Sequence, residues 1–244
     1  MYLPDITAPA ELPPEIQGFK GQQFRWTKGA IQTGKKILPQ LLQSSLPWKI
    51  KLEAIFHLIS PMNYLFISIL ILLLPIFRLH LLGFDKGLYY PPLIDCVMLV
   101  FGTCSTSIFY MCSQRKISSN WLGGIKYLPF LMALGVGIAL NNSRGILEAI
   151  FGKESGFERT PKYGMQAGED KQSWMAKAKG FAKRNYFMAF IELAYGVYLS
   201  FCINLCLQQG TTAYFLLPFL VIFAIGYYYV GILTIYSTCF SLGK

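Results

Sequence analysis

Four stretches of the chain are apolar and long enough to cross a lipid bilayer, which takes about 20 residues. They cover approximately residues 57–77, 93–111, 186–207 and 212–236. Only 14% of the residues are charged, whereas a soluble domain usually carries about a quarter. Four spans also leave too few residues for a complete soluble catalytic domain of about 100–200 residues. The sequence therefore predicts a mainly α, multi-span helical membrane protein.

The distribution of basic residues predicts how the chain is oriented in the membrane. The net charge is +10, and Lys and Arg gather before the first predicted span and again over 144–184. Cytoplasmic loops carry such an excess of cations, so both regions are expected in the cytoplasm, separated by two crossings. The apolar stretch Tyr127–Leu140 then dips into the bilayer without passing through it. We expect an integral protein of the cytoplasmic (inner) membrane that binds no nucleic acid, with its N-terminus in the cytoplasm.

The region before the first span is expected to form amphipathic helices that lie at the lipid headgroups. Apolar residues recur there at helical spacing, with polar residues between them. The apolar set is Trp26, Ala30, Ile31, Ile37, Leu38, Leu41 and Leu42, and the polar set is Lys28, Gln32, Lys35, Lys36 and Gln40. Pro39 and Pro47 are expected to kink or restart the helix. A helix packed on a soluble domain is the alternative.

Residues 21–29, GQQFRWTKG, place an amide, a guanidinium and an indole at the expected start of this helix. The first N–H groups of a helix attract anions, and Arg25 adds a forked donor that suits a diphosphate. The indole of Trp26 offers a flat apolar face for a sugar ring and an N–H for a hydroxyl. On spacing alone, an interfacial anchor at Trp26 and an ordinary cytoplasmic charge at Arg25 fit these residues equally well.

Gln22, Arg25 and Trp26 also match the Q-x-x-R-W motif of the processive family 2 glycosyltransferases, the group of cellulose, mannan, hyaluronan and chitin synthases. The chain resembles bacterial cellulose- and mannan-synthase-like members in particular, through ELP at 11–13 and KGAIQT at 28–33. The order of amphipathic helix, spans, cytoplasmic loop and further spans is similar too. The resemblance implies that Trp26 forms the acceptor platform, and that Gln22 and Arg25 contact the diphosphate or the acceptor-site loops.

A second match lies in the long polar loop 152–185. Phe157, Thr160 and Lys162 fit the family's gating loop, F-x-V-T-x-K, with Arg159 in place of the valine. The resemblance implies that Thr160 and Lys162 close over the nucleotide diphosphate. A hydroxyl and an ammonium on a lid can complete an anion pocket and exclude water. An ordinary solvated basic loop is the alternative.

The resemblance implies an inverting transfer from UDP- or GDP-hexose to a β-linked polysaccharide or a lipid-linked acceptor. The family holds Mg²⁺ or Mn²⁺ on a D-x-D motif and uses an aspartate as its base. No D-x-D occurs in the sequence, so we expect no catalytic base and no metal ligand in this chain. We expect a truncated or split enzyme whose catalytic domain lies upstream, and no sugar transfer by the isolated chain. A non-catalytic membrane subunit or a small transporter is the alternative function.

The expected organisation has six segments. Residues 1–26 end an α/β glycosyltransferase A-type domain, of which only a short remnant is expected, 27–56 form interfacial helices, and 57–112 hold two transmembrane helices. Residues 113–151 form cytoplasmic, interfacial or re-entrant helices, 152–185 form the gating-like loop, and 186–236 hold two more transmembrane helices. Polar residues within the spans, such as Ser68, Asp95 and Glu192, are expected either to line a polysaccharide channel or to bond between helices.

Overall fold

The structure is a computed structural model that describes residues 13, 15–78, 92–117, 120–153, 186–209 and 214–242. All regular structure within these ranges is helical, which confirms the predicted mainly α class. Of the expected α/β remnant, residues 1–12 lie outside the described ranges, and the part from Ile16 onward is helix.

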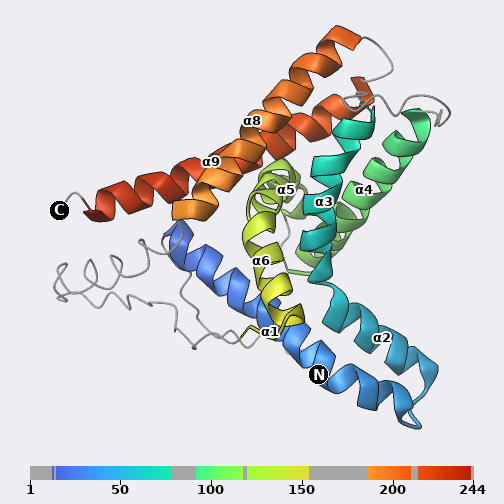
Figure 1. Ribbon diagram of the computed structural model, residues 1–244. Coiled ribbons are helices and arrows are strands. Elements are labelled where there is room, and N and C mark those ends of the chain that lie inside the picture. The colour runs from blue at the N-terminus through green and yellow to red at the C-terminus, as the bar shows by residue number, and fades with distance from the viewer. Residues whose placement is uncertain are drawn as a thin grey trace.

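The helices follow one another as α1 (Ile16–Gln43), α2 (Trp48–Ile59), α3 (Met62–Arg78), α4 (Pro92–Ile117), the 3-10 helix η1 (Trp121–Tyr127), α5 (Leu128–Gly137), α6 (Ala139–Ile150), α8 (Tyr186–Gln209), the 3-10 helix η2 (Tyr214–Leu216) and α9 (Leu217–Leu242). In Figure 1, α8 and α9 lie side by side across the upper part of the molecule and α1 runs along its lower side. Between them, α5 packs on α9, and α6 packs on both α1 and α3.

Two helices among the described residues are by themselves long and apolar enough to cross a membrane: Tyr186–Gln208 of α8 and Leu217–Ser237 of α9. They coincide with the last two predicted spans. Two bent pairs raise the number of possible spans to four. These pairs are Trp48–Ile59 with Met62–Ile76, bent by 57°, and Trp121–Gly137 with Ala139–Ile150, bent by 43°.

The first half of the chain differs from the prediction in its helix boundaries. The predicted span 57–77 begins inside α2 and continues beyond the bend into α3. Pro61 lies at that bend, and because proline has no backbone N–H it cannot continue the hydrogen-bond ladder of α2. The predicted span 93–111 lies within α4, whose 26 residues exceed the length that a crossing requires. For 121–150, a broken span and the predicted re-entrant segment both fit the bend at Ile138.

Side chains from α3, α5, α8 and α9 form the main core. Its buried members include Ile71, Val136, Leu199, Phe223 and Tyr227. A smaller buried cluster of Ile31, Ile146 and Ala149 joins α1 to α6 and contacts residues of α3. The helix α1 is therefore part of the packed structure, because its buried face shares a cluster with α6.

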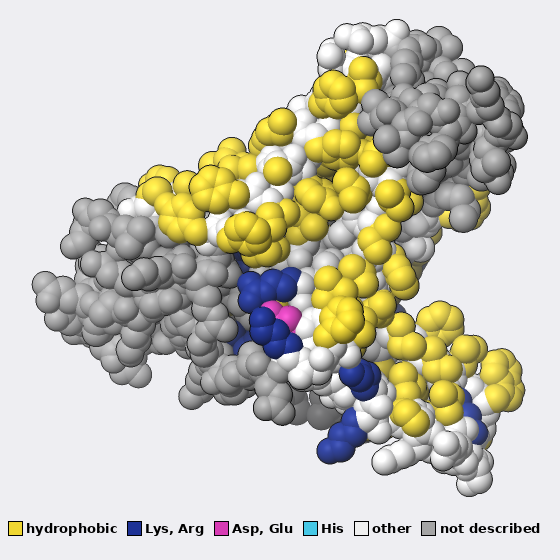
Figure 2. Space-filling view, viewed as in Figure 1, with side chains coloured by type: hydrophobic (Ala, Val, Ile, Leu, Met, Phe, Trp, Pro, Cys, Tyr) yellow, Lys and Arg dark blue, Asp and Glu magenta, His cyan; other side chains and the backbone are white. Residues whose placement is uncertain are grey.

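Large apolar side chains also cover much of the outer surface. Phe101, Phe109, Phe130 and Phe187 are each more than 70% exposed, and Figure 2 shows continuous apolar surface over the upper helices. Soluble monomers rarely expose apolar patches beyond a few hundred Å². This surface fits a lipid environment.

Candidate functional site

The three residues of the Q-x-x-R-W motif lie well inside α1. The helix begins at Ile16, six residues before Gln22, so the backbone N–H groups of Gln22, Arg25 and Trp26 are within the helical hydrogen-bond ladder. The prediction that these residues lie at a helix start is therefore wrong, and unpaired backbone N–H groups cannot bind an anion here. The expected segment boundary between 26 and 27 also falls in the middle of this helix.

Gln22, Arg25 and Trp26 share one face of α1 because residues three and four apart are neighbours on a helix. The buried residues of α1 occupy the opposite face. They are Gln17, Lys20, Thr27, Lys28, Ile31 and Gly34. The indole of Trp26 is 62% exposed. The motif therefore points away from the helix bundle.

The predicted division of α1 into an apolar and a polar face is wrong at Lys28. Trp26 is on the exposed face, whereas Ile31, from the same predicted stripe, is buried. Lys28, predicted on the polar face, is only 5% exposed. A buried lysine requires a partner, and the sequence pattern alone does not reveal one.

That partner is on α6. The Nζ of Lys28 donates to Oε2 of Glu148 at 2.9 Å, and Nε of Arg144 donates to Oε1 of the same carboxylate at 3.0 Å. About two turns further along α1, Nζ of Lys35 donates to the carbonyl oxygen of Ile150 at 2.8 Å. A cation at these last carbonyl groups also stabilises the negative end of the α6 dipole. These contacts fix the middle of α1 to the end of α6.

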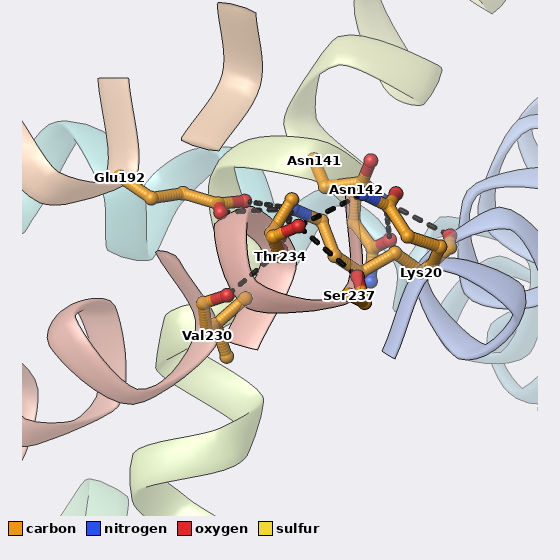
Figure 3. A network of polar contacts seen from close by, with 8 residues as sticks. Lys20, Asn141, Asn142, Glu192, Val230, Thr234 and Ser237 are labelled. Carbon is orange, nitrogen blue, oxygen red and sulfur yellow. Dashed lines mark hydrogen bonds and ion pairs between the residues drawn. The ribbon is translucent and has the colours of Figure 1, made fainter. Parts of the chain in front are cut away.

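A second ion pair joins the first turns of α1 to the two candidate spans (Figure 3). The Nζ of Lys20 lies 2.6 Å and 2.8 Å from the two carboxylate oxygens of Glu192 on α8, and it donates to Oγ1 of Thr234 on α9 at 3.2 Å. Nδ2 of Asn141 on α6 donates to the Lys20 carbonyl oxygen at 2.9 Å. Both charged side chains are fully buried. Burial lowers the pKa of the Lys20 ammonium, and the Glu192 carboxylate opposes that shift.

The pair of Lys20 and Glu192 decides between the two alternatives for Glu192. Glu192 was expected to line a channel or to bond between helices, and the structure shows the second. Lys20 was not among the candidate residues. A lone carboxylate within a predicted span needs a cation as its partner. From this requirement alone, the sequence indicated that a basic residue would pair with Glu192. It did not indicate which of the 22 basic residues would pair with it.

Other polar residues of the predicted spans also bond within the protein. The hydroxyls of Ser68 on α3 and Ser143 on α6 lie 3.1 Å apart. On α4, the hydroxyl of Ser105 donates to the carbonyl oxygen of Gly102 at 2.9 Å. The side chain of Asp95 lies outside the described residues. These contacts indicate that the polar side chains of the predicted spans bond within and between helices, and they do not support a role in lining a channel.

The proposed gating residues Phe157, Thr160 and Lys162 lie in 154–185, outside the described residues. The helices that flank this segment are both attached to α1. Glu148, near the end of α6, pairs with Lys28, and Glu192, near the start of α8, pairs with Lys20. The helix that carries the motif therefore contacts the chain on both sides of 154–185.

The acidic residues of the described part do not fit the Mg²⁺ or Mn²⁺ that the resemblance implies. In the ranges that the structure describes, no group of three or more His, Cys, Asp and Glu side chains could hold a metal ion. Glu148 and Glu192 each bind cationic side chains instead.

No protein-family model, curated protein or solved structure matches the chain. The functional interpretation therefore depends on α1. The Q-x-x-R-W motif faces outward on this helix, and the opposite face is fixed to α6, α8 and α9.

Proposed function

We propose that this chain is the acceptor-binding and gating membrane portion of a glycosyltransferase. The enzyme would transfer a hexose from UDP- or GDP-hexose to a growing β-linked polysaccharide at the cytoplasmic face of the inner membrane. The observation that carries the proposal is the exposed indole of Trp26, which shares one face of α1 with Gln22 and Arg25.

Each group on this face has a chemical role in the proposal. The Trp26 ring would stack on the apolar face of the terminal sugar, and its N–H would bond a hydroxyl. The amide of Gln22 can donate to and accept from hydroxyls. The guanidinium of Arg25 would bind the diphosphate of the donor through two parallel hydrogen bonds. The three groups together suit a site at which a sugar end meets a nucleotide sugar.

The attachment of α1 supports such a role, because a binding face that is already ordered loses less entropy when it binds. Lys20, Lys28 and Lys35 hold the opposite face of the helix at three successive places. The face with Trp26 is therefore on a fixed element rather than on a loop.

The proposed gating role of Thr160 and Lys162 is supported by the length of chain that connects them to α6. The end of α6 contacts α1 through the bond of Lys35 to Ile150, and Lys162 is twelve residues after Ile150. An extended chain covers about 3.3 Å per residue, while a helix with its side chains is about 10–12 Å across. Thr160 and Lys162 can therefore reach the far face of α1, where they would close over a bound diphosphate.

The proposal predicts that Trp26→Ala weakens glycan binding at least about tenfold, which corresponds to about 1.4 kcal/mol. The experiment measures binding of cellohexaose and of mannohexaose to the full 244-residue chain in lipid nanodiscs by isothermal titration calorimetry. Trp48→Ala is the matched control, since Trp48 is 68% exposed but lies on α2. If the wild type and Trp26→Ala bind the glycan with equal affinity, or if Trp48→Ala weakens binding as much as Trp26→Ala does, the result would favour a non-catalytic membrane subunit or a small transporter.

A further inference from the structure

A groove of about 510 Å³ runs along the surface between α3, α6 and α8, and none of the described residues that line it is on α1. Its volume is in the range of small-molecule sites, about 300–1,000 Å³. Most of its lining is aliphatic: Leu65, Leu72, Leu140, Leu147, Met188 and Ile191. At the end near Leu72, the hydroxyl of Tyr198 donates to the Leu72 carbonyl oxygen at 2.7 Å, so α3 and α8 are joined there.

The other end of the groove is charged. Arg144, Glu148 and Lys153 line it, and all three lie in the last part of α6 or directly after it. Glu148 is shared between Lys28 and Arg144, so its single negative charge does not balance the cations around it. Figure 2 shows Lys and Arg side chains next to an acidic one at the edge of the apolar surface. The groove thus combines an apolar trough with a cationic mouth.

This combination excludes a sugar chain as the occupant of the trough. A sugar needs hydrogen-bond partners along its length, but the Ser68 and Ser143 hydroxyls bond to each other. Both hydroxyl oxygens also lie within hydrogen-bond distance of the Tyr64 carbonyl oxygen, at 2.8 Å and 2.9 Å, so their hydrogens are used within the protein. Aliphatic walls favour a hydrocarbon chain. The cationic mouth favours an anionic headgroup, as do basic pockets between membrane helices in general.

We propose that this groove is a binding site for an anionic glycerophospholipid of the phosphatidylglycerol type. One acyl chain lies in the trough between Leu65 and Leu72, and the phosphate binds Arg144 and Lys153. The site is independent of the sugar-transfer reaction. It places a structural lipid against α6, the helix that also holds α1 through Glu148.

The test is native mass spectrometry of the detergent-solubilised 244-residue chain, titrated with phosphatidylglycerol or with phosphatidylcholine of identical acyl chains. We expect about tenfold tighter binding of one phosphatidylglycerol molecule. Lys153→Glu reverses an exposed charge at the mouth and is expected to weaken this binding at least about fivefold. Lys49→Glu is the matched control, because Lys49 is an exposed lysine on α2 and does not line the groove.

A second variant tests the trough itself. Leu72→Trp fills its apolar end and should weaken binding of both lipids. Equal binding of the two lipids by the wild type, or an equal loss in Lys49→Glu and Lys153→Glu, would overturn the site. Displacement of phosphatidylglycerol by an equimolar polyprenyl phosphate would overturn the assignment to a glycerophospholipid.

Discussion

Glu192→Gln is expected to lower the free energy of unfolding by about 3–5 kcal/mol, because it leaves the ammonium of Lys20 buried without a counter-charge. Both side chains are fully buried, and their shortest N–O distance is 2.6 Å. Neither group can turn toward water. Titration with sodium dodecyl sulfate, followed by circular dichroism of the chain in mild detergent micelles, measures the change.

Two controls separate the ion pair from general effects of substitution. Glu53→Gln removes an exposed carboxylate on α2 and should change stability by less than about 0.5 kcal/mol. The double variant Lys20→Met/Glu192→Leu removes both charges, and it should recover most of the loss, since apolar replacements of a buried pair are often neutral or stabilising. If Glu192→Gln is no less stable than Glu53→Gln, the buried pair does not hold α1 to α8.

Gly226→Ala is expected to disrupt the packing of α5 on α9. A Cβ at Gly226 would overlap the backbone carbonyl of Ala133, and one at Gly137 would overlap the carbonyl oxygen of Gly226. Backbone atoms cannot move aside as a flexible side chain can, so the two helices must separate. Overpacking of a well-packed core usually lowers the free energy of unfolding by about 1–3 kcal/mol. Because the clash here is with backbone atoms, we expect a loss of about 3 kcal/mol or more. The apparent melting temperature and the yield of monodisperse protein measure this effect.

Gly135→Ala is the matched control for this crossing. Gly135 lies on α5, two residues before Gly137, and a Cβ there meets no atom within 4 Å. Alanine forms helices better than glycine by about 1 kcal/mol, so this variant should be as stable as the wild type or more so. A Gly226→Ala protein that melts no lower than Gly135→Ala would contradict the close contact between α5 and α9.

The sequence was sufficient for the parts of the fold that depend on local composition. The runs that form α8 and α9 are continuous, apolar and long enough to cross a bilayer, so both helices were predicted correctly. The bend between α2 and α3 was not predicted, because average hydropathy does not register the effect of Pro61 on the backbone. The outward direction of Trp26 also could not be predicted, since it depends on which face of α1 meets α6.

The polar contacts that position the candidate site were harder to predict because they are distant in sequence. Lys20 and Glu192 are 172 positions apart, and Lys28 and Glu148 are 120 apart. A single sequence contains no signal that pairs such residues. Motif spacing did group Gln22, Arg25 and Trp26, because residues three and four apart share a helix face. Their common face follows from the helix that the structure shows over these residues, and their role in glycan binding stays a prediction.

Photo-crosslinking tests most directly whether this face binds the end of a glycan. A cellohexaose or mannohexaose with a diazirine at its non-reducing end is irradiated with the 244-residue chain in nanodiscs, and mass spectrometry locates the modified residues. We expect crosslinks on the exposed face of α1 between residues 22 and 33, with competition by the unlabelled hexaose and loss in Trp26→Ala. Crosslinks confined to other helices, with none on α1, would contradict the proposed acceptor site.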